Sequence, residues 1–154
     1  MLSEVRMLTS TPAQIREHLI SAGPAFIDSL EKRTEIDSYA RRLSLNAVLI
    51  GHLEDKQIAS LCAFYMNLRF SKVHISNVSV DFRFQRRGLA TELLTFLEEH
   101  IKNLSPTTWV IELEVSSGNL QANLFYAKLG FVPHFQGHTD FPGGSFVKMS
   151  KTVN

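Results

Sequence analysis

The sequence predicts an α/β protein built on a mixed, mostly antiparallel central sheet. Two amphipathic helical segments open the chain, three strand-like runs with short turns follow, and helices then alternate with strands. This order is typical of an α/β domain whose sheet combines antiparallel and parallel pairs. With 154 residues, 44% hydrophobic and 20% charged, the chain suits a single domain spanning residues 1–154 with one core.

The first helix is predicted to begin at Thr11, which can cap it, with Pro12 at the first helical position and Gln14 completing a capping box. Gly23-Pro24 is expected to end that helix. A second helix should include residues 35–45, because its apolar residues fall on one face.

The rest of the chain supplies the sheet and two further helices. A turn at Asp55-Lys56 separates two strands, and Gly130 is a usual residue to end a helix. We expect strands over 47–51, 57–66, 73–80, 109–115, 131–135 and 145–150, and helices over 88–102 and 119–129. The total is about six or seven strands flanked by about four helices.

Charge, hydropathy and cysteine content exclude several classes of function. The net charge of +1 gives no electrostatic reason to expect a nucleic-acid partner. No apolar run reaches the roughly 20 residues that span a bilayer, and the first ten residues lack the apolar core of a signal peptide, so we expect neither membrane association nor export. Cys62, the single cysteine, lies in an apolar run and is expected to be a buried small residue rather than a nucleophile. A cytoplasmic protein is the simplest interpretation.

The segment Gln85-Arg86-Arg87-Gly88-Leu89-Ala90 has the properties of a pyrophosphate-binding turn. It follows a strand-like run and opens a helix-like run. The first amides of a helix lack internal partners and carry positive potential, so they can bind phosphate where no side chain blocks the approach. Gly88 and Ala90 permit that approach, and Arg86 and Arg87 add charge. The alternative is a solvated turn before an ordinary surface helix.

Two other phosphate-binding motifs, GxGxxG and GxxxxGK[ST], do not occur in the chain. A second segment, Asn119 to Phe131, strengthens the ligand-binding interpretation of the turn. The pattern Gln-x-x-Gly-x-Ala at Gln85–Ala90, followed by Asn119, Tyr126 and the closing Lys128-Leu129-Gly130-Phe131, resembles the GNAT superfamily of acetyl-CoA-dependent N-acyltransferases. The resemblance covers about Ser71–Phe131 and otherwise extends only to the order of elements.

The resemblance implies an acetyl-CoA site, with coenzyme A as the product. The main-chain amides of Arg86–Ala90 would bind the pyrophosphate, the strand ending at Val80 would pair with the pantetheine arm, and the Val80 amide would stabilise the oxyanion. The coenzyme-binding residues it implies are Val78, Val80, Gln85, Arg86, Arg87, Gly88, Leu89, Ala90, Asn119 and Tyr126.

Two residues of the second segment also have ordinary structural explanations. Asn119 is well suited to be an N-cap, and the resemblance adds a contact with pantetheine. Tyr126 could simply pack in the core beside Phe125 and Leu129. The resemblance implies instead that Tyr126 is catalytic and protonates the leaving thiolate, a step that a phenol of pKa about 10 can perform.

The general base is left open by the sequence. The position that matches a Glu base in several family members is His74, whose imidazole suits the task, although an exposed strand residue is an equal alternative. Glu112 and Glu114 share one face of their strand, and Asp81 lies at the mouth of the turn. A water molecule relaying the proton is a further candidate.

The C-terminal part contains a further group of polar residues. His134, His138 and Asp140 lie in or near an expected loop, Phe135–Ser145, that could be a lid over the acceptor. Their spacing matches no metal motif, so we expect no metal site. Residues 39–67 could form another wall of the acceptor site.

The predicted function is therefore that of an N-acetyltransferase that moves an acetyl group from acetyl-CoA to a primary amine by direct attack in a ternary complex. The alternatives are a non-catalytic acyl-CoA sensor and a structural domain with a vestigial fold. The acceptor, a small molecule or a protein amine, is left open, as are the acyl-chain length and the choice between monomer and homodimer.

Overall fold

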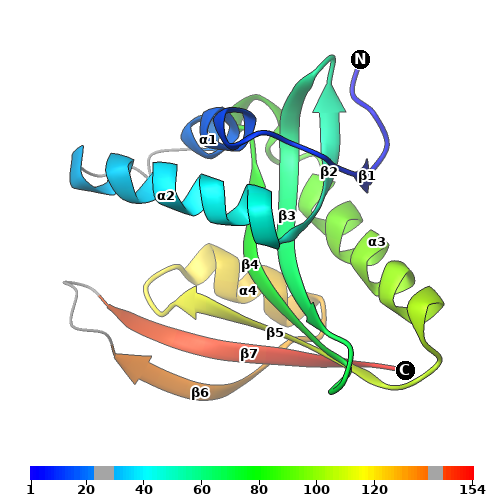
Figure 1. Cartoon of the computed structure of the whole chain (residues 1–154). Helices are drawn as coiled ribbons and strands as arrows, with labels where there is room; N and C mark the ends of the chain where they lie inside the picture. Colours follow the sequence, from blue (N-terminus) through cyan, green and yellow to red (C-terminus); the bar gives the residue numbers. More distant parts are fainter. Residues whose placement is uncertain (23–29, 139–143) are drawn as a thin grey trace. The chain divides into compact units, whose positions relative to one another are not determined.

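The computed structural model describes residues 1–22, 30–138 and 144–154, with the backbone alone for residues 30–34. In this part of the chain, seven strands and four α-helices occur in the order shown in Figure 1: β1 (Arg6–Met7), α1 (Pro12–Ser21), α2 (Leu30–Asn46), β2 (Val48–Glu54), β3 (Gln57–Asn67), β4 (Lys72–Val80), the 3-10 helix η2 (Phe82–Phe84), α3 (Leu89–Leu104), β5 (Trp109–Ser116), α4 (Leu120–Lys128), β6 (Val132–His138) and β7 (Ser145–Val153). The strands form one sheet in the order β1-β2-β3-β4-β5-β7-β6, in which only the β4–β5 pair is parallel among the pairings described. This confirms the predicted fold class.

The first compact unit contains Met1–Tyr65 and Asn77–His100. Its strands β1, β2 and β3 pair in antiparallel fashion around the Asp55-Lys56 turn. Helices α1 and α2 cover one face of β2 and β3, and α3 covers the other (Figure 1). The α1–α2 face buries a cluster made of Ile15, Leu19, Ile36, Ala40, Leu43, Leu49, Ile58, Leu61 and Ala63. On the α3 face, the buried ring of Phe64 meets the edge of His100, which stacks on Phe96.

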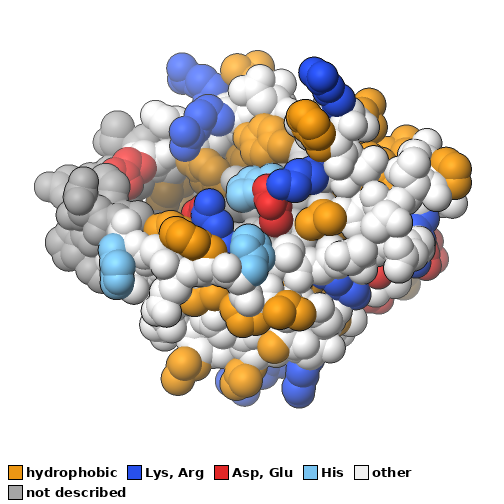
Figure 2. Space-filling view, turned by 90° about the horizontal axis from the view of Figure 1, so that it is seen from below, with side chains coloured by type: hydrophobic (Ala, Val, Ile, Leu, Met, Phe, Trp, Pro, Cys, Tyr) orange, Lys and Arg blue, Asp and Glu red, His pale blue; other side chains and the backbone are white. Residues whose placement is uncertain are grey.

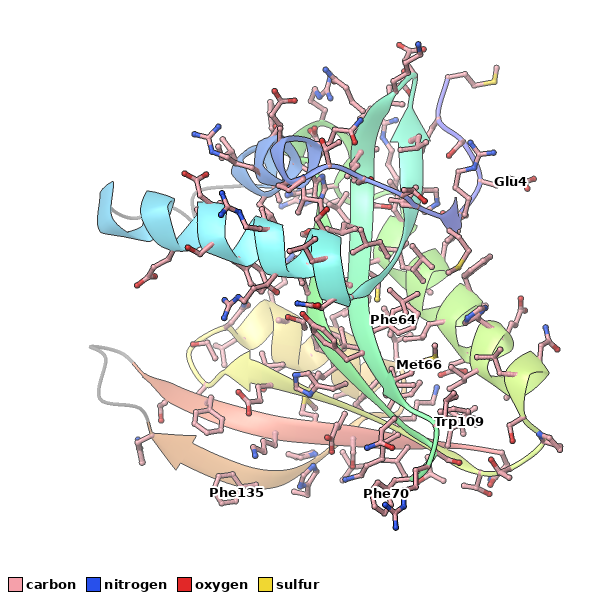
Figure 3. All side chains as sticks on the ribbon, in the orientation of Figure 1. Glu4, Phe64, Met66, Phe70, Trp109 and Phe135 are labelled. Carbon is pink, nitrogen blue, oxygen red and sulfur yellow. The ribbon has the colours of Figure 1, made fainter. Side chains whose placement is uncertain are left out.

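The second compact unit contains Met66–Ser76 and Ile101–Asn154. The start of β4 pairs with β5 from Lys72↔Val110 to Ile75↔Leu113, and β5 then pairs along its whole length with β7. Strand β6 forms the end of the sheet beside β7. Trp109 is buried at the start of β5, whereas Phe70 and Phe135 project from the ribbon at the surface (Figure 3).

Most helix boundaries agree with the sequence. The predicted capping box is present, because the Thr11 side chain accepts from the Gln14 amide and the Gln14 side chain accepts from the Thr11 amide. Helix α1 ends at Ser21, and the proposed terminator Gly23-Pro24 lies outside the described residues. No helix in the described ranges is long and apolar enough to cross a membrane.

The expected loop from Phe135 to Ser145 is wrong in part. Residues 135–138 continue strand β6, and Gln136 and His138 pair with Val147 and Ser145. Gly137 suggested a loop, yet a Cβ there would lie 2.6 Å from the Phe146 ring and 2.8 Å from the Phe135 ring. The glycine therefore makes room for two aromatic rings on a strand. Asp140 and the rest of 139–143 lie outside the described residues.

Candidate active site

The carboxyl end of β4 presents main-chain groups of Val78 and Val80 along one edge of the strand. The Asp81 amide donates to the Ala59 carbonyl of β3 at 2.8 Å. Since successive residues of a strand direct their main-chain groups to opposite edges, the N–H and C=O of Val80 point away from β3, and so do those of Val78, two residues earlier. Both valine side chains are half-buried.

Asp81 fixes the start of the turn that follows β4. Its carboxylate accepts from the Arg83 amide at 2.9 Å and from the Arg83 guanidinium at 3.1 and 3.0 Å. Burial by itself would raise the pKa of Asp81, but the hydrogen bonds and the charge of Arg83 outweigh burial and hold that pKa below its usual value. Asp81 is thus an ionised structural group that begins η2.

Gln85 closes the same turn through its side chain. Its Nε2 donates to the Val80 carbonyl at 3.0 Å and to the Ala22 carbonyl at 3.1 Å. The two bonds join the end of β4 to the C-terminal end of α1. Gln85 therefore shapes the turn through its side-chain nitrogen, and the structure gives it a role that its motif position alone did not reveal.

The turn enters α3 through two left-handed residues, Arg86 (φ 64°) and Gly88 (φ 78°). The Glu92 amide donates to the Gly88 carbonyl, so the amides of Leu89, Ala90 and Thr91 precede the first hydrogen bond of the helix. A Cβ on Gly88 would have nothing within 4 Å. Open space thus lies beside a series of helix-start amides, an arrangement suited to a phosphate.

Positive charge is concentrated at this turn. The guanidinium groups of Arg83 and Arg87 lie 5.2 and 5.3 Å from the centroid of the Phe84 ring. Arg86 and Arg87 are exposed, whereas Leu89 is buried beneath the first turn of α3 and Ala90 is half-buried. The aromatic contact restricts Arg87 beside the helix start, where an anion would be attracted.

Two buried histidines, neither singled out by the sequence, secure this region. His52 on β2 places its Nε2 2.9 Å from the Glu92 carboxylate, in the first turn of α3, and its Nδ1 contacts the hydroxyl of Ser60. His18 on α1 contacts Ile58 and Ser79. These pairs are far apart in sequence, so no local pattern could have found them.

In the second unit, Asn119 and Asn123 build the start of α4. The Asn119 side chain accepts from the Ala122 amide at 3.1 Å, which confirms the predicted N-cap. Asn123, which the motif did not include, donates from Nδ2 to the carbonyls of Ser116 and Asn119. Together they fix the turn that carries the chain from β5 into α4.

Tyr126 occupies an aromatic cluster on α4. Its ring meets those of Phe125 and Phe131 edge-on, with centroids 5.1 and 5.5 Å apart, and 9% of the residue is exposed. The Phe131 amide donates to the Tyr126 carbonyl, and Gly130, at φ 96°, makes that turn possible. The predicted core contact is therefore present, and its partners are Phe125 and Phe131.

Comparison with protein families decides the class of the protein. A family described as "Acetyltransferase (GNAT) domain" matches residues 17–153. The chain belongs to this GNAT acetyltransferase family. It is therefore an acyltransferase, and the family uses acetyl-CoA as co-substrate.

Solved structures share the GNAT fold at low sequence identity, and no curated protein matches the chain in sequence. The ribosomal-protein-S18-alanine N-acetyltransferase from Escherichia coli is 21% identical, with a TM-score of 0.75 over 99% of this chain and 94% of that one. PaiA N-acetyltransferase from Thermoplasma acidophilum, in complex with coenzyme A, is 15% identical, with a TM-score of 0.71 over 97% and 99%. An aminoglycoside 6'-N-acetyltransferase complexed with coenzyme A is 12% identical, with a TM-score of 0.72 over 97% of each chain.

The candidate bases of this GNAT protein in the second unit lie on the exposed side of β4 and β5. His74 is exposed and stands in register with Glu112. Glu112 lies 3.6 Å from Lys72, and Glu114 lies 3.8 Å from Lys148. Each carboxylate thus has a lysine beside it, and Figure 2 shows both signs of charge, together with histidine, on one face of the molecule.

A hollow of about 350 Å³ in the first unit is lined by none of the predicted site residues, although Thr91 and Glu92 in its wall directly follow Ala90. Its three carboxylates would repel the pyrophosphate of a coenzyme. The lining residues are Glu4, Val5, Thr91, Glu92, Thr95, Phe96 and Glu99.

Of the remaining polar candidates, His134 and His138 lie among the described residues and Asp140 lies outside them. His138 Nδ1 lies 3.2 Å from the Ser145 hydroxyl, across the β6–β7 pair, and His134 is exposed on β6. No group of three His, Cys, Asp or Glu residues is arranged to bind a metal in the described ranges. Cys62 is fully buried, and burial raises its pKa to about 12, so its thiol is not a nucleophile.

The structure thus gathers the predicted residues in two groups, one in each unit. Val78, Val80 and the turn Gln85–Ala90 are consecutive parts of the first unit. In the second unit, Asn119 caps the start of α4 and Tyr126 lies near the end of that helix. The second unit also contains His74.

Proposed function

We propose that this GNAT protein transfers an acetyl group from acetyl-CoA to a primary amine by direct attack in a ternary complex. The observation that carries the proposal is the turn after β4, where left-handed Arg86 and Gly88 lead into the first amides of α3 beside open space. The family match spans parts of both units, and we propose that they act as one cytoplasmic acetyltransferase domain, as a monomer or homodimer.

In the proposed complex, the pyrophosphate accepts hydrogen bonds from the main-chain amides of Arg86–Ala90, with Arg86 and Arg87 supplying charge. The pantetheine arm pairs with the main-chain groups of Val78 and Val80, which point away from β3. Asn119 and Tyr126 of α4 complete the coenzyme contacts. Gln85 contributes by holding the turn in shape.

The proposed reaction forms one C–N bond and breaks one C–S bond. The neutral amine attacks the thioester carbonyl, and the Val80 amide stabilises the oxyanion that develops. Collapse of this intermediate expels the thiolate of coenzyme A, which receives a proton from the Tyr126 hydroxyl. The amine proton passes to a general base, directly or through water.

We propose His74 as that base. The pair with Arg83 keeps Asp81 ionised but weakens it as a proton acceptor. Glu112 and Glu114 each have a lysine beside them, Lys72 and Lys148, and are thus already engaged in ion pairs. His74 is exposed on the same strand that leads to Val80, and an imidazole can accept a proton near neutral pH.

The acceptor class is proposed only as a primary amine. Among the similar structures, one is named for an alanine of a ribosomal protein and another for an aminoglycoside, so protein and small-molecule amines both belong in a screen. The mixed charge of the exposed strands gives no preference for a strongly charged acceptor.

The test is a calorimetric titration of acetyl-CoA into the purified protein, followed by a screen of amines for thiol release. Micromolar coenzyme binding together with release that depends on an amine is the expected result. Binding without release for any amine would favour the acyl-CoA sensor. No binding at millimolar coenzyme would refute the proposal and leave a structural domain as the better account.

A further inference from the structure

A buried histidine on α1 is connected to the end of β4. His18 is 2% exposed, and its Nδ1 lies 3.0 Å from the Ile58 carbonyl of β3. Its Nε2 lies 2.8 Å from the hydroxyl of Ser79, which lies 2.7 Å from Asn77 Oδ1. Ser79 and Asn77 are 6% and 5% exposed. Four polar groups from three elements therefore meet inside the first unit.

The hydrogen bonds define the charge and orientation of this imidazole. A carbonyl only accepts, so Nδ1 carries a proton and donates to Ile58. Burial lowers the pKa of His18. It outweighs three interactions that would raise that pKa: the hydrogen bond to the Ile58 carbonyl, the charge of Asp81 and the contact with Ser79. The neutral ring therefore has a bare Nε2 that accepts the Ser79 proton, and the Asn77 amide, turned so that Nδ2 rather than Oδ1 faces Ser79, then donates to the Ser79 oxygen. Asp81, paired with Arg83, is the charged group near the ring.

The position of Ser79 gives this contact its significance. The peptide between Ser79 and Val80 carries the Val80 N–H, which points away from β3. The side chain of Ser79 is held on the buried side of the strand by His18 and Asn77. These contacts of Ser79 oppose rotation of the peptide about the strand axis. The hydrogen bond from the Asp81 amide to the Ala59 carbonyl, one residue later, opposes it as well.

We propose that His18 is a positioning residue for acetyl transfer: through Ser79 it holds the peptide whose Val80 N–H stabilises the oxyanion. This inference rests on the proposed function. An oxyanion donor contributes only when it is fixed before the charge develops, so a loosened peptide lowers kcat. The affinity for the coenzyme, which is spread over the turn Arg86–Ala90 as well as the main chain of Val78 and Val80, changes less.

Two substitutions of similar size separate this role from general packing. Glutamine at position 18 can place an amide atom where Nε2 lies and keep the bond to Ser79. Asparagine can place one where Nδ1 lies and keep only the bond to Ile58. We expect His18→Gln to keep kcat within about threefold of the parent and His18→Asn to lower kcat about tenfold, with the Kd for acetyl-CoA unchanged within about twofold.

Ser79→Ala supplies the second measurement, because it removes the hydroxyl without adding volume. It should lower kcat about as much as His18→Asn, and the double variant should lose little more, since both changes break one connection. Ile15→Val, a fully buried change on the same helix, is the control for lost stability and should leave kcat unchanged below its melting temperature.

The outcomes are distinguishable. If the parent protein neither binds acetyl-CoA nor releases thiol, the proposed function fails and the positioning role is overturned with it. If the parent is active, equal kcat values for His18→Gln and His18→Asn, or a loss in Ile15→Val as large as in Ser79→Ala, would overturn the positioning role. Additive losses in the double variant would also overturn it, because the two residues would then act separately.

Discussion

The candidate residues of the two units differ in kind. In the first unit, the groups proposed to face the ligand are main-chain amides, and the side chains of Gln85, Asp81 and His18 are proposed to act by holding the backbone. In the second unit, Tyr126 and His74 would act with their own side chains. A site built from backbone depends on conformation, whereas one built from side chains depends on residue type.

This contrast explains why different substitutions should affect the two units. Removing a side chain that faces the ligand matters little in the first unit, because the donors belong to the backbone. Blocking the approach or disturbing the supports there should be severe. In the second unit, loss of one hydroxyl or imidazole should change the chemistry and leave coenzyme binding intact.

The largest effect is expected for Gly88→Glu. The new side chain would extend into the open space beside the helix-start amides and bring negative charge to the pyrophosphate. We expect the affinity for acetyl-CoA to fall by more than about a hundredfold in calorimetry. Gly88→Ala is the matched control: it adds only a Cβ at φ 78°, with a cost of about 1 kcal/mol in unfolding free energy. Retained affinity in Gly88→Glu would place the pyrophosphate elsewhere.

The next effect is expected for Tyr126→Phe, which keeps the ring among Phe125 and Phe131 and removes only the hydroxyl. Loss of the proton donor should lower kcat about a hundredfold, with the Kd for acetyl-CoA nearly unchanged. Steady-state kinetics and calorimetry measure the two quantities. An unchanged kcat would assign Tyr126 to packing alone.

A smaller effect is expected for Asp81→Asn, which removes the ionised partner of Arg83. The free energy of unfolding should fall by about 1 kcal/mol at neutral pH, because Arg83 is half-exposed and solvent screens the pair. Since folding lowers the pKa of Asp81, this stability is present above the pKa of the unfolded chain and is lost as the pH falls through the folded pKa. Urea unfolding from pH 7 to pH 3 should therefore show the variant and the parent converging in acid.

The last effect is expected from His18 and is confined to acidic pH, because it has the pH dependence of a histidine whose pKa is lowered by folding. The unfolded chain binds a proton near pH 6.5, whereas the folded chain binds it at lower pH. Stability from this group is therefore complete above pH 6.5 and falls on acidification, by at most about 1.4 kcal/mol per pH unit. Melting of the parent and His18→Gln between pH 7.5 and 5 measures it, and an identical slope in both would show that His18 does not cause the change.

The elements that the sequence predicted well are those with local signals. Thr11 with Gln14, and Asn119 before α4, are caps whose partners lie within three residues. Strand β1 was missed, because two residues paired with Ile50 and Gly51 leave no periodic pattern. Gly137 misled the loop prediction, since the rings of Phe135 and Phe146 that require it cannot be recognised from the glycine itself.

The candidate site divides in the same way. The turn Gln85–Ala90 was found because its glycine and helix start are adjacent in sequence. The supports were missed: His18 and Ser79 are 61 residues apart, and His52 and Glu92 are 40 apart. Only the fold brings such pairs together, so the sequence indicates the turn itself better than it indicates the side chains that hold its backbone.

The burial of Cys62 has a practical consequence for every kinetic measurement above. The protein contains one cysteine, and that thiol is fully buried with a pKa raised to about 12. A disulfide reagent added to a running reaction will therefore develop colour from free coenzyme A alone, with no background from the folded protein. Heated or urea-treated samples will expose one equivalent per chain, so the same reagent counts unfolded molecules.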